Sequence, residues 1–541
     1  MTTVTGAAPV PAAGLPAVAA WWPMPFARRG WRRIGAVAAL LLVLSAGAAC
    51  DPGSGGARER GLGSDTDRPA AGPPPSPPTG GAAPAPPLRW QPCEGGECAR
   101  LAVPLDHRDP SGASLRLALF RVTARRPEDR IGSLLVNPGG PGGSGIDFLR
   151  QAVDELPGEL RDRFDLVAWD PRGAGRSDPV DCGPGLDDYF AVDTSPETEA
   201  EWDAAEGAAR SFADACRDGS GTTLLSHVDT LSTVRDMDLI RAALGEPKLT
   251  YLGYSYGTLL GAFYAQEFPQ RVRALVLDGA VDPSVPPERT AVQQAEGFEQ
   301  NLRAFLAACG RDVRCGFARG GDPLAAYDRI MRAVDREPLK VATSEGVRLL
   351  GPSEADMGVA AALYSRESWP YLAQALDAAA RGDGSVLLDF FDQYVERRPD
   401  GTYGTQWTSF ISISCVDGPA VPGGAAGFRR IAEAAAAAAP HFGRANVVLG
   451  LPCAFWSVPP VLTTGPVDAP DAPTVVVIGT SRDPATPLVW SEGLARQLGA
   501  RLVVHDGEGH TAFPQGDRCL DPAVISYLVS TELPRAGLRC G

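Results

Sequence analysis

One stretch, YLGYSYGTLLG at residues 251–261, constrains the fold more than any other part of the chain. The preceding KLTYLG predicts a short strand, and the following TLLGAFYAQEF predicts a helix with apolar residues at helical spacing. Ser255 therefore stands at a strand-to-helix turn, between Gly253 and Gly257. Gly-x-Ser-x-Gly at such a turn is typical of a nucleophile elbow, in which small residues let the backbone turn sharply and present the hydroxyl. The alternative is a glycine-rich turn in which Ser255 only caps the helix.

The bulk properties exclude several classes of function. The chain has 541 residues, of which 44% are hydrophobic, so it can form two or three domains with a sizeable core. Its net charge of −15 and the lack of a Lys/Arg cluster in its body argue against a nucleic-acid partner. With five histidines, no H-E-x-x-H and no paired C-x-x-C, the sequence predicts no metal site and no cofactor.

The N-terminal region is typical of an export signal. RRGWRR at 28–33 precedes the apolar run 34–50, which is shorter than the roughly 20 residues of a membrane span. The run ends in Gly-Ala-Ala-Cys, which resembles a bacterial lipoprotein signal and predicts lipidation of Cys50. Gly47 departs from that pattern, and ordinary cleavage after Ala48 is the alternative. Residues 51–87 are rich in Pro and Gly and predict a disordered linker, so we expect an exported protein at the cell surface, held to the membrane only by its lipid.

The cysteine count supports an oxidising compartment. Besides Cys50 there are ten cysteines, enough for five disulfides. The sequence does not fix their connectivity, and some could be buried free thiols. Pairing of neighbours would join Cys93–Cys98, Cys182–Cys216, Cys309–Cys315, Cys415–Cys453 and Cys519–Cys540.

Strands and helices alternate through much of the chain. LRLALFRVTA, GSLLVNPGG, DLVAWDPRG, LTYLGYS and RALVLDGA read as strands separated by helices, which predicts a largely parallel sheet covered on both faces. Residues 284–465 read as mostly helical, and the strand–helix rhythm then returns. We therefore expect an α/β core at 88–283 and 466–541, interrupted by a large helical cap insertion at 284–465.

A nucleophilic serine needs a base and a group that orients the base. Where the elbow belongs to a parallel sheet, these follow in the order acid, then histidine, on loops at the carboxyl ends of strands. Asp483 follows the predicted strand TVVVIGTSR, and His510 follows RLVVHDGEG. Asp506 is a rival acid on the same loop as His510, whereas His505 lies within its predicted strand.

The loop NPGGPGGSG at 137–145 follows the predicted strand SLLV. Glycines allow backbone N–H groups to approach an oxyanion closely, and prolines stiffen the loop. We expect the oxyanion donors to be the backbone N–H groups of Gly140 and Tyr256. A phosphate-binding loop is the alternative, but G-x-x-x-x-G-K-[ST] and a nearby lysine are absent from the sequence.

NPGGPGGSG, WDPRGAGRSDP, GYSYGT, SRDPATP and GEGHT, in this order, resemble the tripeptidyl aminopeptidase family of α/β-hydrolases, relatives of the prolyl aminopeptidases. YSRESWPYLAQAL and SISCVD are similar to that family's insertion, although Arg366 stands where proline is frequent, and the C-terminal part resembles its TAP-like module. The resemblance covers residues 88–541 and implies an α/β-hydrolase fold. It also implies a secreted serine exopeptidase that releases short peptides, typically tripeptides, from free N-termini, with Ser255, Asp483 and His510 as its triad.

Two other functions stay open at this stage. An esterase or thioesterase could use the same catalytic groups, and an inactive surface-binding protein could retain the fold. An aminopeptidase also needs an acidic residue to bind the substrate ammonium, at a fixed distance from Ser255 and, we expect, on the insertion. Glu299, Glu354, Glu367 and Asp417 are possible, with solvated helix faces as the alternative; we select Glu367 and Asp417. The oligomeric state is not predicted.

Overall fold

The computed structural model describes residues 88–541 apart from 313–314, 419 and 463. The expected signal at 1–50, the linker at 51–87 and Cys50 lie outside the described residues. Within the part that is described, no helix is both long and apolar enough to cross a membrane.

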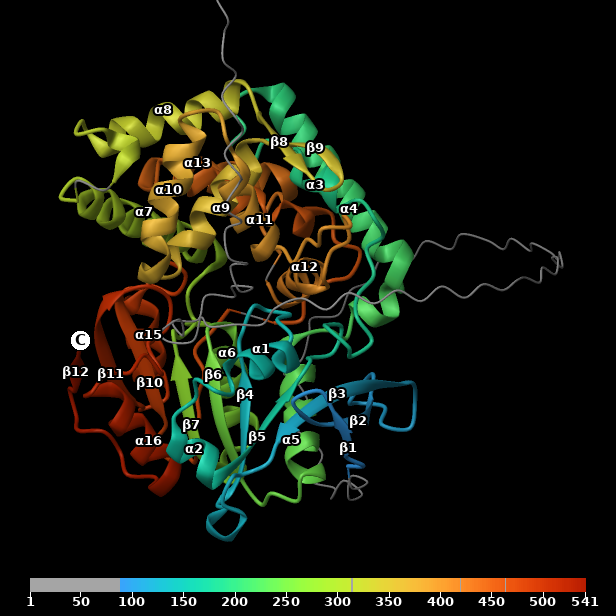
Figure 1. The fold of residues 1–541 in the computed structure, drawn as a ribbon. Coiled ribbons are helices and arrows are strands. Elements are labelled where there is room, and N and C mark those ends of the chain that lie inside the picture. The colour runs from blue at the N-terminus through green and yellow to red at the C-terminus, as the bar shows by residue number, and fades with distance from the viewer. Residues whose placement is uncertain (1–87, 313–314, 419, 463) are drawn as a thin grey trace, which may run out of the picture. The chain divides into compact units, whose positions relative to one another are not determined.

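A ten-stranded sheet forms the core, in the order β1-β2-β3-β5-β4-β6-β7-β10-β11-β12 (Figure 1). Its parallel strands are β4 (Gly132–Asn137), β5 (Phe164–Trp169), β6 (Leu249–Tyr254), β7 (Val272–Asp278), β10 (Val476–Arg482), β11 (Arg501–Glu508) and β12 (Arg539–Cys540). An antiparallel edge consists of β1 (Gln91–Cys93), β2 (Gly96–Pro104) and β3 (Ser114–Val122), and β3 also pairs antiparallel with β5. The predicted α/β class with a largely parallel sheet is confirmed.

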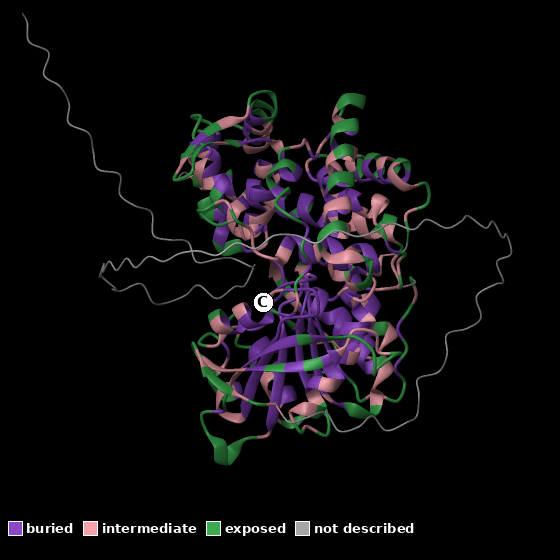
Figure 2. Ribbon diagram, turned by 90° about the vertical axis from the view of Figure 1, so that its right-hand side faces the viewer, coloured by how far each residue is buried: buried purple, intermediate pink, exposed green. Residues whose placement is uncertain are grey.

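The central strands are buried on both faces because helices cover both faces (Figure 2). Alternate residues of one strand enter different cores: Leu134 and Val136 pack on one side of the sheet, and Leu135 packs on the other. One face is covered by α1 (Gly145–Ala152), α2 (Gly158–Arg163) and α16 (Leu520–Ser530). The other face is covered by α5 (Thr230–Ala243), α6 (Tyr256–Glu267) and α15 (Leu488–Gln497).

A large helical region separates β7 from β10 and lies beyond the carboxyl ends of the parallel strands (Figure 1). It contains α7 (Pro287–Cys309), α8 (Pro323–Arg336), α9 (Pro352–Leu363), α10 (Trp369–Ala379), α11 (Ser385–Tyr394), α12 (Gln406–Asp417), α13 (Gly424–Ala438) and α14 (Gly443–Val448), with short 3-10 turns η3 (Gly316–Ala318), η4 (Arg366–Ser368) and η5 (Leu451–Phe455). One hairpin, β8 (Leu339–Thr343) with β9 (Gly346–Leu350), was not expected there.

Helix α4 (Glu199–Leu225) also departs from the expected organisation. It lies in the chain between β5 and β6, yet its Trp202 and Ala209 pack against Phe428 and Ile431 of α13. The layer above the strands therefore combines the insertion with a helix of the core segment.

All five neighbouring cysteine pairs form disulfides in the structure. The bond between Cys415 and Cys453 fastens α12 to η5 within the insertion. The alternative, that some of these ten cysteines are buried free thiols, is therefore wrong.

Candidate active site

The turn at Ser255 is strained, and its hydroxyl does not cap the helix. Ser255 alone separates β6 from α6, with φ 53° and ψ −125°, a conformation rare for residues that carry a Cβ. A Cβ on Gly253 would lie 2.5 Å from the carbonyl oxygen of Gly257, and a Cβ on Gly257 would lie 2.8 Å from Oδ1 of Asn137, so neither position has room for a side chain. The Ser255 side chain makes no hydrogen bond to the first turn of α6, which excludes the capping alternative.

The glycine-rich loop after β4 presses against this turn. Gly139 has φ 98°, and a Cβ there would lie 2.9 Å from Cβ of Ser255 and 3.1 Å from the Tyr256 nitrogen. The Asn137 side chain fixes the loop, because its Oδ1 accepts a hydrogen bond from the Gly139 N–H at 2.9 Å. Among the described residues, the N–H groups of Gly140 and Tyr256 donate to no protein acceptor. The two expected donors are thus free, and Gly139, the residue before Gly140, lies beside the serine.

Asp483 and His510 form a buried, hydrogen-bonded pair. Nδ1 of His510 lies 2.9 Å and 3.0 Å from the two carboxylate oxygens of Asp483, and the side chains are 3% and 0% exposed. The Asp483 carboxylate also accepts hydrogen bonds from the N–H groups of Ala485, Thr486 and Thr511, and from the Thr486 hydroxyl. This arrangement fixes the imidazole with its other nitrogen, Nε2, available.

Ser255 and His510 both adjoin Asp278–Gly279 at the end of β7. The Ser255 N–H donates to the Asp278 carbonyl at 2.9 Å, and a Cβ on Gly279 would lie 3.2 Å from Cε1 of His510. The Asp278 carboxylate accepts from the N–H groups of Ala512 and Phe513, and burial raises its pKa to about 7. Asp278 therefore positions the loop that carries His510, whereas Asp483 contacts the imidazole itself.

The insertion contacts His510 directly. The His510 N–H donates to the Tyr364 carbonyl at 2.8 Å, and the Tyr364 ring packs edge-on against the imidazole. Beside it, Arg366 pairs with Glu508, which also pairs with Arg482. Arg366, the residue at which this sequence departs from the resembled family, therefore connects η4 to the segment that leads to His510.

The rival acid is separated from the imidazole. Asp506 forms an ion pair with Arg539 at the surface, and its side chain is 48% exposed. His505 lies within β11, as its position in the sequence predicts, and Asp506 also lies in β11 rather than on the loop of His510, where it was expected.

The four acidic candidates on the insertion have different environments. Glu299 is paired with His441 and Arg303, and Glu354 accepts a hydrogen bond from the Gly351 N–H at the start of α9. Glu367 is exposed, and it accepts a hydrogen bond from the Ser365 hydroxyl.

Asp417 is partly buried at the end of α12 and accepts two hydrogen bonds from Thr230. Burial and then the neighbouring Asp229 raise its pKa to about 8. In the described part of the chain, no arginine or lysine forms an ion pair with it.

Sequence reasoning missed four residues of this site: Asp278, Thr486, Tyr364 and Thr230. Asp278 and Thr486 carried a usable signal, because each lies at or just beyond the carboxyl end of a predicted strand, as Asp483 does. Tyr364 and Thr230 carried none, since they reach the site only through long-range packing.

Within the described residues, one group has atoms close enough to hold a metal: Asp517, Cys519 and Cys540. The two cysteines are joined in a disulfide, so their sulfurs are not thiolate ligands.

Residues 132–517 match the family described as alpha/beta hydrolase fold. The chain is 38% identical to "Serine protease Hip1" of Mycobacterium tuberculosis over 482 residues, which cover 84% of this chain and 91% of that protein. It is 36% identical to "Carboxylesterase B" of the same species, covering 82% and 86% of the two chains. It is 30% identical to "Tripeptidyl aminopeptidase" of Streptomyces lividans, covering 82% and 83%.

Proposed function

The chain belongs to the α/β-hydrolase family and is a serine hydrolase, and we propose that it is an exported exopeptidase that releases short peptides from free N-termini. Ser255, Asp483 and His510 are its proposed triad, and tripeptides are its proposed product. The observation that carries the proposal is the buried pair of His510 and Asp483. This pair lies at the carboxyl ends of the parallel strands, where the strained, uncapped Ser255 also lies. Relatives named as a serine protease and a tripeptidyl aminopeptidase support peptides as the substrate class.

The proposed mechanism follows from the contacts of the imidazole. Nδ1–H of His510 donates to Asp483, so Nε2 is free to accept the Ser255 proton as Oγ attacks a peptide carbonyl. Asp483 stabilises the imidazolium that forms. The N–H groups of Gly140 and Tyr256 bind the oxyanion, and His510 then protonates the leaving amine. Water attacks the acyl-enzyme with His510 again as base.

We assign Asp417 as the acid that binds the substrate ammonium. Its two oxygens accept from Thr230, but a carboxylate offers about four lone-pair sites, so further donors can bind. Burial and then the neighbouring Asp229 raise its pKa to about 8, and a bound ammonium would supply the opposite charge that stabilises the ionised carboxylate. Glu367 of η4 is the alternative, because η4 adjoins the His510 loop.

A paired hydrolysis assay tests the proposal. A chromogenic tripeptide amide with a free N-terminus is compared with its acetylated form, and Ser255→Ala is the control. We expect only the free form to be cleaved, and only when Ser255 is present. Cleavage of both forms at equal rates would contradict exopeptidase selectivity, and full activity in Ser255→Ala would contradict the triad.

Two conservative variants locate the amine site. We expect Asp417→Asn to raise KM for the free tripeptide amide about tenfold or more, which corresponds to roughly 1.4 kcal/mol of lost binding. Glu367→Gln, the matched control, should change KM less than twofold. If Glu367→Gln produces the loss instead, the ammonium binds at η4 and the assignment to Asp417 is wrong.

A second candidate function is ester hydrolysis, which the relative named carboxylesterase B favours. The proposed triad serves both reactions, so the acyl pocket decides between them. Hydrolysis of simple p-nitrophenyl esters without cleavage of either tripeptide amide would favour the esterase.

The export proposal includes lipidation of Cys50, which would hold the enzyme to a membrane behind a Pro/Gly-rich linker. The five disulfides suit an oxidising compartment. Mass spectrometry of the mature N-terminus tests this: a diacylated Cys50 is expected, and an unmodified N-terminus after residue 48 would contradict it.

A further inference from the structure

Helix α12 contacts both sides of the proposed oxyanion hole. At its start, Ser409 packs against the glycine-rich loop so closely that a Cβ on Gly142 would lie 2.5 Å from Cβ of Ser409. At its end, Asp417 accepts hydrogen bonds from Thr230, at 2.8 Å from the backbone N–H and 2.6 Å from the hydroxyl. One helix of the insertion therefore supports the loop of Gly140 and lies close to the residue after Ser255.

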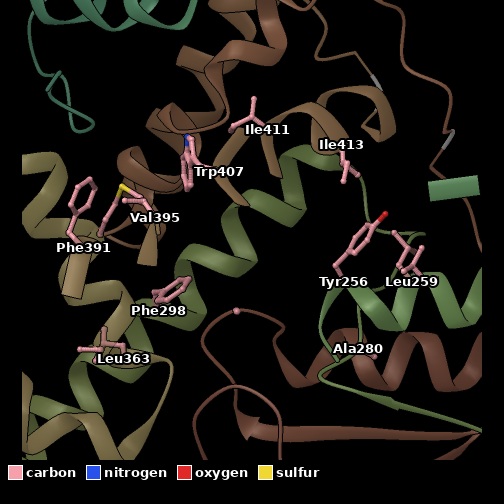
Figure 3. Packing of buried hydrophobic residues seen from close by; sticks show 14 of the residues in the cluster. Tyr256, Leu259, Ala280, Phe298, Leu363, Phe391, Val395, Trp407, Ile411 and Ile413 are labelled. Carbon is pink, nitrogen blue, oxygen red and sulfur yellow. The ribbon is translucent and has the colours of Figure 1, made fainter. Parts of the chain in front are cut away.

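Thr230 connects Asp417 to Tyr256. Its hydroxyl oxygen lies 2.5 Å from the Tyr256 hydroxyl, and Thr230 is fully buried as the first residue of α5. Figure 3 shows the Tyr256 ring at the start of α6, with its hydroxyl on the side of the ring away from that helix. When Asp417 is ionised, the Thr230 hydroxyl donates to the carboxylate and the Tyr256 hydroxyl donates to Thr230.

Resting on the proposed function, we propose that Thr230 is a positioning residue for the oxyanion hole. It fixes the Tyr256 side chain, and thereby the Tyr256 backbone N–H, by a hydrogen-bonded chain that ends on Asp417 of the insertion. The backbone at this point is strained, since Ser255 has a positive φ, and so it needs an external restraint to hold the donor in place. The ring supplies that restraint because it is buried and its hydroxyl has a partner.

The test measures hydrolysis of a short-chain p-nitrophenyl ester, which has no amine and so does not depend on ammonium binding. We expect Thr230→Val to lower kcat about tenfold or more with KM changed less than twofold, because a misplaced oxyanion donor acts on the transition state. Tyr256→Phe keeps the backbone N–H but loses the hydroxyl, and it should lower kcat similarly. The double variant should be no worse than either single variant, since both break one chain.

Two variants serve as controls. Thr230→Ser retains the hydroxyl and should restore kcat to within about threefold of the parent enzyme, since only the methyl group is lost. Thr233→Val makes the same change at another buried threonine of α5. The Thr233 hydroxyl donates to the Asp229 carbonyl and takes no part in the hydrogen-bonded chain from Tyr256 to Asp417. The kcat of this variant should stay at the parent level. Thermal melting establishes that each variant is folded.

Three results separate the outcomes. Parent-level kcat in both Thr230→Val and Tyr256→Phe would overturn the positioning role. A loss confined to KM on the free tripeptide amide would also overturn it, because Thr230 would then act only through ammonium binding. If Ser255→Ala keeps full esterase activity and still reacts with a fluorophosphonate probe, the proposed function itself fails, independently of Thr230.

Discussion

Asp483 accepts more hydrogen bonds than a turn-forming aspartate requires. Two N–H groups after it account for an ordinary turn, but the Thr511 N–H, the Thr486 hydroxyl and the His510 imidazole also converge on its carboxylate. The residue therefore serves both the local turn and the orientation of the imidazole.

Replacing this carboxylate tests its role at the residue scale. Asp483→Asn removes the negative charge that faces the imidazole, so we expect kcat for the tripeptide amide to fall about 10³–10⁴-fold with KM little changed. Asp506→Asn in β11 should stay within about twofold, because its ion pair with Arg539 is exposed. Retention of more than a tenth of the parent kcat by Asp483→Asn would contradict the assignment.

At the scale of elements, α12 is where the insertion and the core depend on each other. It packs against the glycine-rich loop, it carries Asp417, and the bond between Cys415 and Cys453 holds it to η5. Helix α4 adds a second connection, since it belongs to the core segment but packs against α13. The helical region is therefore part of the proposed site, and not only a cover over it.

Removing disulfides measures how much this connection stabilises the fold. Loss of the Cys415–Cys453 bond, which spans 38 residues, should lower the free energy of unfolding by about 4 kcal/mol on the chain-entropy estimate. Loss of Cys93–Cys98, which spans 5 residues, should cost about 2 kcal/mol. Denaturant unfolding of the two paired Cys→Ser variants checks the order, and an equal or reversed loss would show that loop entropy does not govern these bonds.

At the scale of the whole molecule, buried carboxyl groups dominate the pH dependence. Burial raises the pKa of Asp278 and Asp356 to about 7, that of Asp417 to about 8 and that of Asp521 to about 6. Hydrogen bonds and charges from Glu299 and Asp328 raise the pKa of His441 against the effect of its burial. Between about pH 4 and these values, the folded state binds more carboxyl protons than the unfolded state, so stability falls as the pH rises.

We therefore expect Tm to decrease as the pH is raised from 5.5 to 8.5. The range stays above pH 5 because the pKa values of Asp236 and Glu508 are lowered by their cationic partners, and their stabilisation is lost only in acid. Asp356→Asn should make Tm fall less steeply with pH. The loss of unfolding free energy between pH 5.5 and 8.5 should be smaller by about 1 kcal/mol or more. Thermal melts at several pH values check this, with Asp506→Asn as the exposed control. If Tm depends on pH equally in Asp356→Asn and in the parent protein, Asp356 does not contribute to the pH dependence.

The sequence by itself determined the features that depend on chain neighbours. The alternating strands and helices, the glycine-flanked Ser255, and the acid and histidine that follow later strands are set by local sterics and by burial on both faces of each strand. The hairpin β8–β9 also had a local signal, two short strand-like runs separated by two polar residues and Gly346, which the helical composition around it obscured.

Only the tertiary structure decided the features that depend on distant contacts. Thr230 and Asp417 are 187 residues apart, and Tyr364 meets His510 across 146 positions, so no periodicity or motif could pair them. The placement of α4 against the insertion is of the same kind. These contacts form because apolar faces of separate segments share one core, and the polar groups buried with them must find partners there.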